Sequence, residues 1–264
     1  SASNSQIENF PIQSFVNFFS NHGLLEIEIK KRPKWRTVTS GSQAYVKKII
    51  DSFHGNLQIK NEVKAIIRES DKISIKTEVD TESKFDQIII ATHPDEALKI
   101  LHNPSRNEKN ILSKIRYEKS HAFLHTDHEA MPVSKKAWSS WNYKSSKNRD
   151  FSDKVCVTYW MNKLQNIDNK FPLFVSLNPE KPPSNKKIIK EFIYDHPIFD
   201  FNSIKAQKEL LSIQGQRGIW YCGAYFGFGF HEDGIQSGLY VAEKLSGIKR
   251  PWSVEKESGR ILNE

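Results

Sequence analysis

The sequence predicts a mixed α/β fold, with an α+β portion in this chain, from three observations. Residues 84–91 end in the run Ile88-Ile89-Ile90, which is typical of a parallel-sheet strand buried on both faces. Residues 218–245 resemble a short apolar strand, a glycine-rich loop and a helix. Residues 117–161 contain three segments of strand character, which predict an antiparallel sheet.

The first half of the chain predicts two helices followed by strands. Apolar residues at helical spacing predict a helix over 10–19, and Gly23 supplies its stop. The serine-rich start at 40–42 predicts a capped amphipathic helix that ends at Gly55. Three β-rich runs follow at 57–68, 72–79 and 84–91.

The second half predicts the antiparallel sheet and an informative tail. We expect strands at 117–127, 137–143 and 154–161, a loop over 172–183, and a short helix over 204–214 that ends at Gly215. A strand at 218–223 and a helix at 234–245 come next, and the end after Arg250 reads as frayed and polar.

Composition places the chain among globular proteins. It has 264 residues, of which 38% are hydrophobic and 27% charged, and no apolar run approaches the length of a membrane span. Its two cysteines, Cys156 and Cys222, fit a reducing, cytoplasmic compartment. The chain starts without Met and contains only Met131 and Met161, which favours a fragment of a longer open reading frame.

The net charge of +8 suggests an anionic partner, either nucleic acid or a lipid surface. The basic residues gather only at 144–149 and 181–190, in stretches that read as solvated loops without interleaved aromatic residues. We therefore expect no nucleic-acid binding. Peripheral membrane association stays open as an alternative.

Two segments have the layout of a ligand site. In the tail, glycines and a helix start could cradle an anion or cofactor, and the alternative is an ordinary loop between strand and helix. The G-x-G-x-x-G fingerprint is absent, because Glu232 stands where the third glycine would follow Gly227 and Gly229. The strand at 84–91 delivers Ala91 and Thr92 to a crevice, or it is a plain core strand that ends in a turn.

Other chemistries find little support. The residues His121, His125, Asp127 and His128 span a strand and its turn, so we expect no metal site. No G-x-S-x-G elbow occurs, which argues against an esterase. Cys222 follows an apolar strand and is expected to be a packed residue rather than a nucleophile.

The order of several short motifs resembles the flavin-containing amine oxidoreductases, and among them the bacterial group of predicted NAD/FAD-binding proteins. The resemblance runs from Phe10 to about Ser246. The motifs are Asn21-His22-Gly23-Leu24-Leu25, Trp35-Arg36-Thr37-Val38, Ala91-Thr92-His93-Pro94-Asp95, Leu124-His125-Thr126-Asp127, Trp138-Ser139-Ser140-Trp141-Asn142-Tyr143, Tyr159-Trp160-Met161-Asn162, and Gly223-Ala224-Tyr225 with Gly229-Phe230-His231-Glu232-Asp233-Gly234.

The resemblance implies an FAD/NAD(P)-binding Rossmann-like domain and a mixed-sheet substrate domain. On this basis residues 1–55 and 106–215 belong to the substrate domain, 56–105 and 216–250 to the FAD domain, and 251–264 form a tail. The family's dinucleotide fingerprint precedes everything seen here, so the chain resembles the C-terminal part of such a protein. The strand at 220–223 would then lack its neighbour, and FAD would not be retained without the N-terminal region.

The resemblance also assigns site residues. The expected cofactor contacts are Val63 (with Glu62), Ala91, Thr92, Gly223, Ala224, Phe230, His231, Glu232, Asp233, Gly234 and Ile235. The expected substrate-cavity residues are Trp35, Arg36, Trp141, Asn142, Tyr159, Trp160 and Asn162, which could instead be aromatic core packing. No catalytic residue is assigned, since Lys119 lies near the strand where amine oxidases carry a lysine but its neighbours do not match. Ser40-Gly41 replaces the family's Gly-Gly pair.

The implied activity is hydride transfer from a small-molecule or lipid-like substrate to FAD, with the substrate, electron acceptor and oligomeric state unassigned. The alternative is a non-catalytic remnant or a binding module for an anionic partner. The missing fingerprint and the +8 charge motivate this alternative.

Overall fold

The computed structural model describes residues 10–79, 82–144 and 156–253. The chain divides into two compact units. Unit 1 comprises residues 1–56 and 118–196, and unit 2 comprises residues 57–117 and 197–264. Within the described ranges, no helix is long and apolar enough to cross a membrane.

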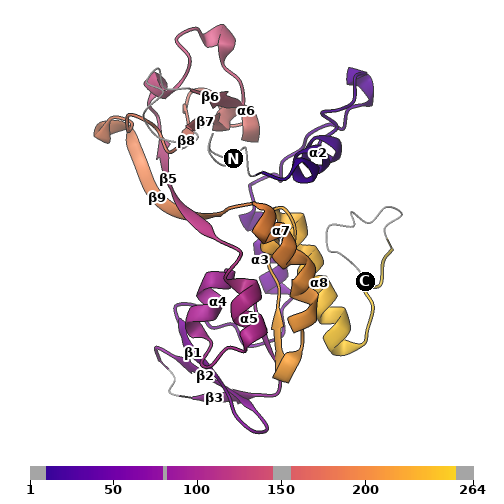
Figure 1. Cartoon of the computed structure of the whole chain (residues 1–264). Coiled ribbons are helices and arrows are strands. Elements are labelled where there is room, and N and C mark those ends of the chain that lie inside the picture. Colours follow the sequence, from indigo (N-terminus) through magenta and orange to yellow (C-terminus); the bar gives the residue numbers. More distant parts are fainter. Residues whose placement is uncertain (1–9, 80–81, 145–155, 254–264) are drawn as a thin grey trace. The chain divides into compact units, whose positions relative to one another are not determined.

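Unit 1 begins with the two predicted helices (Figure 1). Helix α2 spans Ile12–Asn21 and ends at His22, after which Gly23 has a φ of +63°, a conformation that glycine adopts without strain. Helix α3 spans Gln43–Asp51, after the predicted serine-rich start. Both helices are therefore confirmed to within a few residues.

The rest of unit 1 is a sheet with the strand order β6-β7-β8-β5-β9. Its strands are β5 (Tyr117–His125), β6 (Trp141–Tyr143), β7 (Val157–Trp160), β8 (Phe174–Leu177) and β9 (Ile188–Pro197), and helix α6 (Met161–Gln165) follows β7. The registered pairs β5–β8, β6–β7 and β7–β8 are antiparallel, as predicted. Strand β8 lies in the stretch expected to be a loop, and β9 was not expected.

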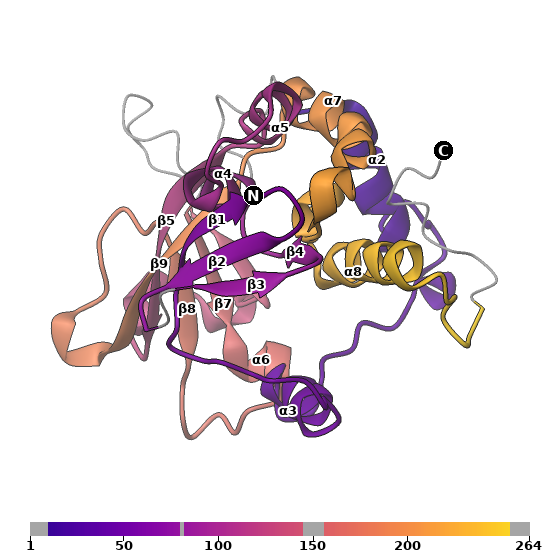
Figure 2. The same cartoon turned by 90° about the horizontal axis from the view of Figure 1, so that it is seen from below.

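Unit 2 contains two small sheets. Strands β1 (Val63–Arg68), β2 (Ile73–Thr77) and β3 (Ser83–Phe85) form an antiparallel meander (Figure 2). Strand β4 (Ile88–Ile90) pairs in parallel with β10 (Ile219–Tyr221). The predicted run 84–91 is thus split between β3 and β4. The expectation that it is buried on both faces is wrong, because the side chain of Ile89 is 45% exposed.

Helices pack beside these sheets in unit 2. They are α4 (Pro94–Ile100), α5 (Arg106–Leu112), α7 (Phe201–Glu209) and α8 (His231–Ser246). Apolar residues of α4, α5 and α7 join those of β4 and β10 in one buried cluster that includes Leu112, Leu210 and Ile219. Helices α5 and α7 lie in unit 2, whereas the sequence placed 106–215 in the substrate domain.

Short 3-10 helices complete the chain. They are η1 (Ile29–Lys31), η2 (His128–Ala130), η3 (Lys135–Ala137), η4 (Asn185–Lys187), η5 (Leu210–Ile213), η6 (Gln216–Gly218) and η7 (Ala224–Phe226). The helix predicted over 204–214 corresponds to α7 followed by η5, and Gly215 after it has a φ of +68°.

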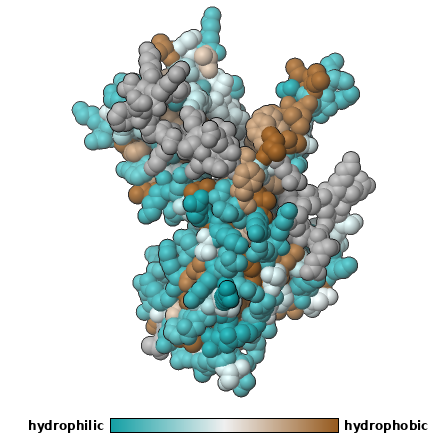
Figure 3. Space-filling view, viewed as in Figure 1, coloured by the Kyte–Doolittle hydropathy of each residue, from teal (hydrophilic) through white to brown (hydrophobic). Residues whose placement is uncertain are grey.

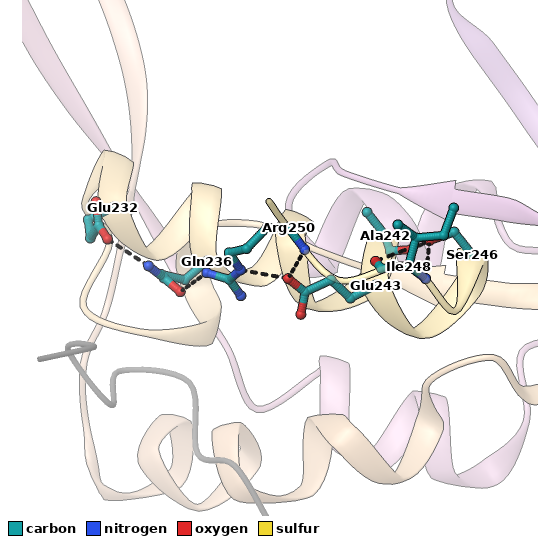
Figure 4. Close-up of polar contacts among 7 residues, drawn as sticks. All are labelled: Glu232, Gln236, Ala242, Glu243, Ser246, Ile248 and Arg250. Carbon is teal, nitrogen blue, oxygen red and sulfur yellow. Dashed lines mark hydrogen bonds and ion pairs between the residues drawn. The ribbon is translucent and has the colours of Figure 1, made fainter. Parts of the chain in front are cut away.

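The segment after α8 folds back along that helix (Figure 4). The Arg250 guanidinium lies 2.6 Å from the Glu243 carboxylate and 3.5 Å from the Gln236 side-chain oxygen. Gln236 in turn donates to Glu232 at 2.8 Å. Arg250 is therefore attached to the helix, and the predicted frayed end after Arg250 lies outside the described residues from 254 onward.

Candidate cofactor and substrate sites

The parallel strands β4 and β10 end side by side in unit 2. The Cys222 N–H donates to the Ile90 carbonyl at 3.1 Å, so Ala91 and Thr92 leave the sheet beside the start of the Gly223 loop. Ala91 and Thr92 are both exposed. The carboxyl ends of parallel strands are where α/β sheets bind ligands.

The loop between β10 and α8 depends on Gly223. Its φ of +156° disfavours other residues, and a Cβ at this position would lie 2.6 Å from the ring of Tyr225. The Ser237 hydroxyl accepts a hydrogen bond from the Gly223 N–H at 2.9 Å. Packing within the protein therefore explains this glycine and fixes the path of the backbone at Gly223-Ala224.

Asp233 holds the second half of the same loop. Its carboxylate is fully buried and accepts hydrogen bonds from the N–H groups of Phe228 and Phe230, at 2.9 and 2.8 Å. A Cβ on Gly227 would lie 2.3 Å from this carboxylate, so Gly227 leaves the space that Asp233 fills. Asp233 thus positions the loop from inside and does not face a ligand.

Gly234 differs from these glycines because the fold does not require it. A Cβ there would find its nearest neighbour, the Ala224 nitrogen, at 3.9 Å. Glycine inside a helix costs about 1 kcal/mol relative to alanine. Gly234 lies at the positive end of the α8 dipole, and a Cβ there would make only an ordinary van der Waals contact. The position therefore suits a group that approaches the backbone closely and carries negative charge.

The other expected cofactor residues fall into two places. Phe230, His231, Glu232 and Ile235 are exposed around the start of α8. Val63 begins β1 in the separate three-stranded meander, where it pairs with Thr77. The structure therefore brings the strand ends and the α8 start together, and it places Val63 on another sheet of the same unit.

A buried ionic group is hydrogen-bonded to β10 through the side chain of Tyr221. The Tyr221 hydroxyl donates to the Glu108 carboxylate at 2.6 Å, and the Arg68 guanidinium pairs with the same carboxylate. Burial opposes ionisation of Glu108, but its hydrogen bonds from Tyr221, Ser105 and Arg68 lower its pKa overall. Burial, together with the Glu108 carboxylate, raises the pKa of Tyr221. This group ties β1, α5 and β10 together.

In unit 1, three of the expected cavity residues share one region. Trp35 and Trp141 meet edge to face with ring centroids 5.1 Å apart, and both are about half exposed. Tyr159 lies directly opposite Trp141 in the β6–β7 pair. Burial raises the pKa of the Tyr159 hydroxyl. Arg36, next to Trp35 in the chain, is exposed.

The expected amides serve the fold instead. Asn142 is buried and bonds to the Ser139 backbone, at 3.0 Å to its N–H and 2.6 Å to its carbonyl, and to the Thr158 carbonyl at 3.2 Å. Asn162 is also buried and bonds to the backbone of its own loop, including the Leu173 N–H at 2.8 Å. Because these amides are engaged by the backbone, we leave both residues out of the substrate site.

Trp160 also separates from the Trp35 group. Side chains alternate along a strand, so Trp160 projects to the face opposite Tyr159. There its ring packs edge to face against Trp138 at 5.3 Å. The seven expected cavity residues therefore do not converge on one site in unit 1.

Of the residues weighed as metal ligands, His125 and Asp127 are buried and hydrogen-bonded within the protein, whereas His121 and His128 are exposed. His125 is fully buried, with Nε2 2.9 Å from the Ser176 hydroxyl, and burial lowers its pKa. Asp127 accepts hydrogen bonds from Ser184 N–H at 3.0 Å and from the Lys187 ammonium at 2.9 Å. Among residues 10–79, 82–144 and 156–253, no group of three or more His, Cys, Asp or Glu side chains could hold a metal ion.

Some residues that shape the site escaped the sequence interpretation. Gln207 of α7 donates to the carbonyls of Tyr225 and Gly227, at 3.0 and 2.5 Å, and Ser237 binds Gly223. The spacing of four between Asp233, Ser237 and Val241 marks the buried side of α8 and could have identified Ser237. The sequence around Gln207 gives no comparable signal.

The fold defines an α/β protein, and its candidate ligand site lies at the ends of parallel strands. Comparison with known families identifies the family of this chain. The family of flavin containing amine oxidoreductases matches residues 14–145, half of the chain. The chain belongs to this family. The comparison with curated proteins gave no match.

Solved structures agree with this fold. One is a CLA-producing fatty acid isomerase from P. acnes, with a TM-score of 0.56 and 15% identity over 79% of this chain and 52% of that one. Another is wild-type putrescine oxidase bound to putrescine, with a TM-score of 0.55 and 10% identity over 80% of this chain and 54% of that one. The chain therefore spans about half the length of these structures.

Proposed function

We propose that the protein is an FAD-dependent oxidoreductase and that unit 2 carries part of its flavin site. The observation that carries this proposal is that the fold gives no packing reason for glycine at position 234: a Cβ there would make only an ordinary van der Waals contact, and glycine is unfavourable inside a helix. Membership of a flavin-containing family supports a flavin as the ligand.

Each part of the site has a distinct role in this proposal. Backbone groups at Ala91-Thr92 and Gly223-Ala224 line the strand ends, and the α8 start offers its dipole to negative charge on the cofactor. Asp233 and Ser237 keep the loop in place through the bonds described above. Bound FAD would supply the hydride-accepting chemistry, and the protein supplies binding and orientation.

Unit 1 is proposed to bind the substrate. Trp35 and Trp141 present half-exposed rings, and Tyr159 extends the same face of the sheet. Such rings suit an apolar small molecule or a lipid-like chain, since aromatic walls bury apolar surface and exclude water. Arg36 beside them suits an anionic group on that substrate. The identity of the substrate and the catalytic residue are left unassigned.

The test is the flavin content of the protein purified from the organism that encodes it. A tag at the C-terminus of the gene product keeps any segment that precedes this sequence. We expect denaturation of the purified protein to release FAD in near-equal amount to the chain, measured by absorbance and chromatography. A preparation that releases no flavin contradicts the proposal.

A variant pair locates the site. Gly234→Leu should lower the FAD content at least about tenfold, because a side chain there fills the space that the cofactor needs. Ala242→Leu, two turns further along α8 at an exposed position, is the matched control and should keep its FAD. Equal FAD content in the two variants would remove the α8 start from the flavin site.

A further inference from the structure

Strand β9 forms one edge of the five-stranded sheet in unit 1 (Figure 1). Its inner side pairs antiparallel with β5, because the Thr126 N–H donates to the Lys187 carbonyl at 3.0 Å and, at the other end, the Ile198 N–H donates to the Arg116 carbonyl at 2.8 Å. In the part of the chain that the structure describes, no strand pairs with the outer side. The backbone N–H and C=O groups along that side need partners, so an edge ten residues long is a template for a further strand.

Apolar side chains are exposed on both faces of β9. On one face the Lys190 ammonium lies 4.9 Å from the centre of the Phe192 ring, and this ring stacks on Tyr194 with centroids 5.5 Å apart. Ile189 and Ile193 project to the opposite face and are 57% and 56% exposed. Hydrophilic and hydrophobic residues are interspersed over the part of unit 1 that contains β5 and β9 (Figure 3). A strand added at this edge would therefore meet apolar and charged side chains on either face.

The charges along β9 restrict how the same strand of a second copy could pair with it. Two copies related by a two-fold axis perpendicular to the sheet join their β9 strands antiparallel, and one residue at the centre then lies opposite itself. A pair centred on Lys190 or on Glu191 sets like charges directly opposite each other. A pair centred on Ile193 sets Glu191 opposite Asp195 twice. Like charges in these positions are destabilising, which disfavours all three registers.

The register centred on Phe192 has no such conflict. It spans 188–196, sets the two Phe192 rings against each other and brings Lys190 opposite Tyr194 on both sides of the centre. Aromatic pairs and a cation beside an aromatic ring are both stabilising across strands. A register centred on Tyr194 would span only 191–197 and would include Pro197, which has no N–H to donate.

We infer that β9 is the interface of a symmetric dimer, in which β9 of a second copy continues the sheet of unit 1 with Phe192 opposite Phe192. Backbone hydrogen bonds between the two strands supply the pairing, as in other cases of strand addition. The charges at 190, 191 and 195 supply the specificity, because they oppose the neighbouring registers.

The dimer concerns the sheet of unit 1 alone. The candidate flavin site lies in unit 2, and none of its residues belongs to β9. Flavin content and oligomeric state are therefore separate measurements, and neither result decides the other.

The experiment combines sedimentation with disulfide cross-linking, on protein purified through the C-terminal tag from the organism that encodes it. We expect the wild type to sediment as a dimer. Phe192→Cys should form a disulfide-linked dimer on mild oxidation, because residues directly opposite in an antiparallel pair lie within disulfide reach. Tyr194→Cys is the matched control on the same face. Its two copies would lie about 14 Å apart along the strands, so it should form no more cross-linked dimer than the wild type with its own two cysteines.

A pair of charge variants tests the register without cysteines. Tyr194→Lys sets a lysine opposite Lys190 twice in the dimer, whereas Tyr194→Glu sets a carboxylate there. We expect the dimer of the lysine variant to dissociate at a concentration about tenfold higher than that of the glutamate variant. A wild type that is monomeric at all concentrations, cross-linking at position 194 but not at 192, equal dissociation of the two charge variants, or a different protein cross-linked to position 192 would each overturn the inference.

Discussion

The Glu108 carboxylate shows how one buried side chain can hold a strand, here β10, in position. It forms the capping box of α5, accepting from the Ser105 N–H at 2.7 Å, and it also meets Arg68 and the Tyr221 hydroxyl. Its side chain is 1% exposed, so neither charge of the pair is solvated. Loss of one partner would leave the other charge buried alone.

We therefore predict that Glu108→Gln lowers the free energy of unfolding by about 3–5 kcal/mol. Tyr221→Phe should cost about 1.5–3 kcal/mol, because it removes one hydrogen bond to a charged group. Urea unfolding measures both. The control is Glu62→Gln, which breaks an exposed pair with Lys64 and should cost far less, because water and salt screen an exposed pair. A cost at Glu108 no larger than this control would show that the buried pair contributes little.

At the scale of elements, the Asp233 carboxylate holds the second half of the loop between β10 and α8. Both N–H groups bonded to Asp233 belong to the loop, and they share one carboxylate oxygen. Asparagine can place its carbonyl oxygen at that position, whereas alanine leaves two donors without an acceptor. The loop conformation thus depends on the acceptor more than on the charge.

Asp233→Ala should accordingly loosen the loop, and Asp233→Asn should preserve most of it. We expect the amides of Phe228 and Phe230 to exchange at least about tenfold faster in the alanine variant, at a cost of about 2 kcal/mol. Hydrogen exchange at these two amides is the measurement. Comparable acceleration in the asparagine variant would mean that the charge, through the α8 dipole, holds the loop.

Elements with strong local signals could be predicted from the sequence, and those that depend on partners could not. Helices α2, α3 and α8 could be predicted because the spacing of their apolar residues and the signals at their ends are local features of the sequence. Strand β8 was expected to be a loop because its flanking prolines dominate the local pattern, while its place between β5 and β7 is a tertiary effect. The roles of Asn142 and Asn162 were likewise invisible, since an amide that binds substrate and one that binds backbone look alike in sequence.

At the scale of the whole molecule, the two expected sites fall in different units. The expected cofactor contacts all lie in unit 2, and the expected substrate residues all lie in unit 1. The family resemblance could predict this separation because its motifs keep their order along the chain. It could not predict which residues of each set share a face, because that depends on strand register. Four of the six tryptophans, Trp35, Trp138, Trp141 and Trp160, are in unit 1, so tryptophan fluorescence reports mainly on that unit.

Tryptophan fluorescence can therefore follow the acid unfolding of unit 1. We expect Asp127 to contribute to the acid sensitivity of this unit. Burial opposes its ionisation, but hydrogen bonds from the Ser184 N–H, the Lys187 ammonium and the Glu129 N–H bring its pKa down to about 2 from an ordinary 3.8. A carboxyl whose pKa is lower in the folded state stabilises the protein above the unfolded pKa. That contribution, on the order of 2 kcal/mol, is lost as pH falls from about 4 to about 2.

Asp127→Asn should therefore unfold more easily than the wild type at pH 7, and the two proteins should converge near pH 2. Urea unfolding followed by tryptophan fluorescence at pH 7, 4 and 2.5 measures the difference. Asp86→Asn is the control, because Asp86 is an exposed partner of Lys72 in unit 2 and should leave the fluorescence transition in place. A difference between wild type and Asp127→Asn that persists unchanged at pH 2.5 would mean that the side chain stabilises unit 1 through packing rather than through its charge.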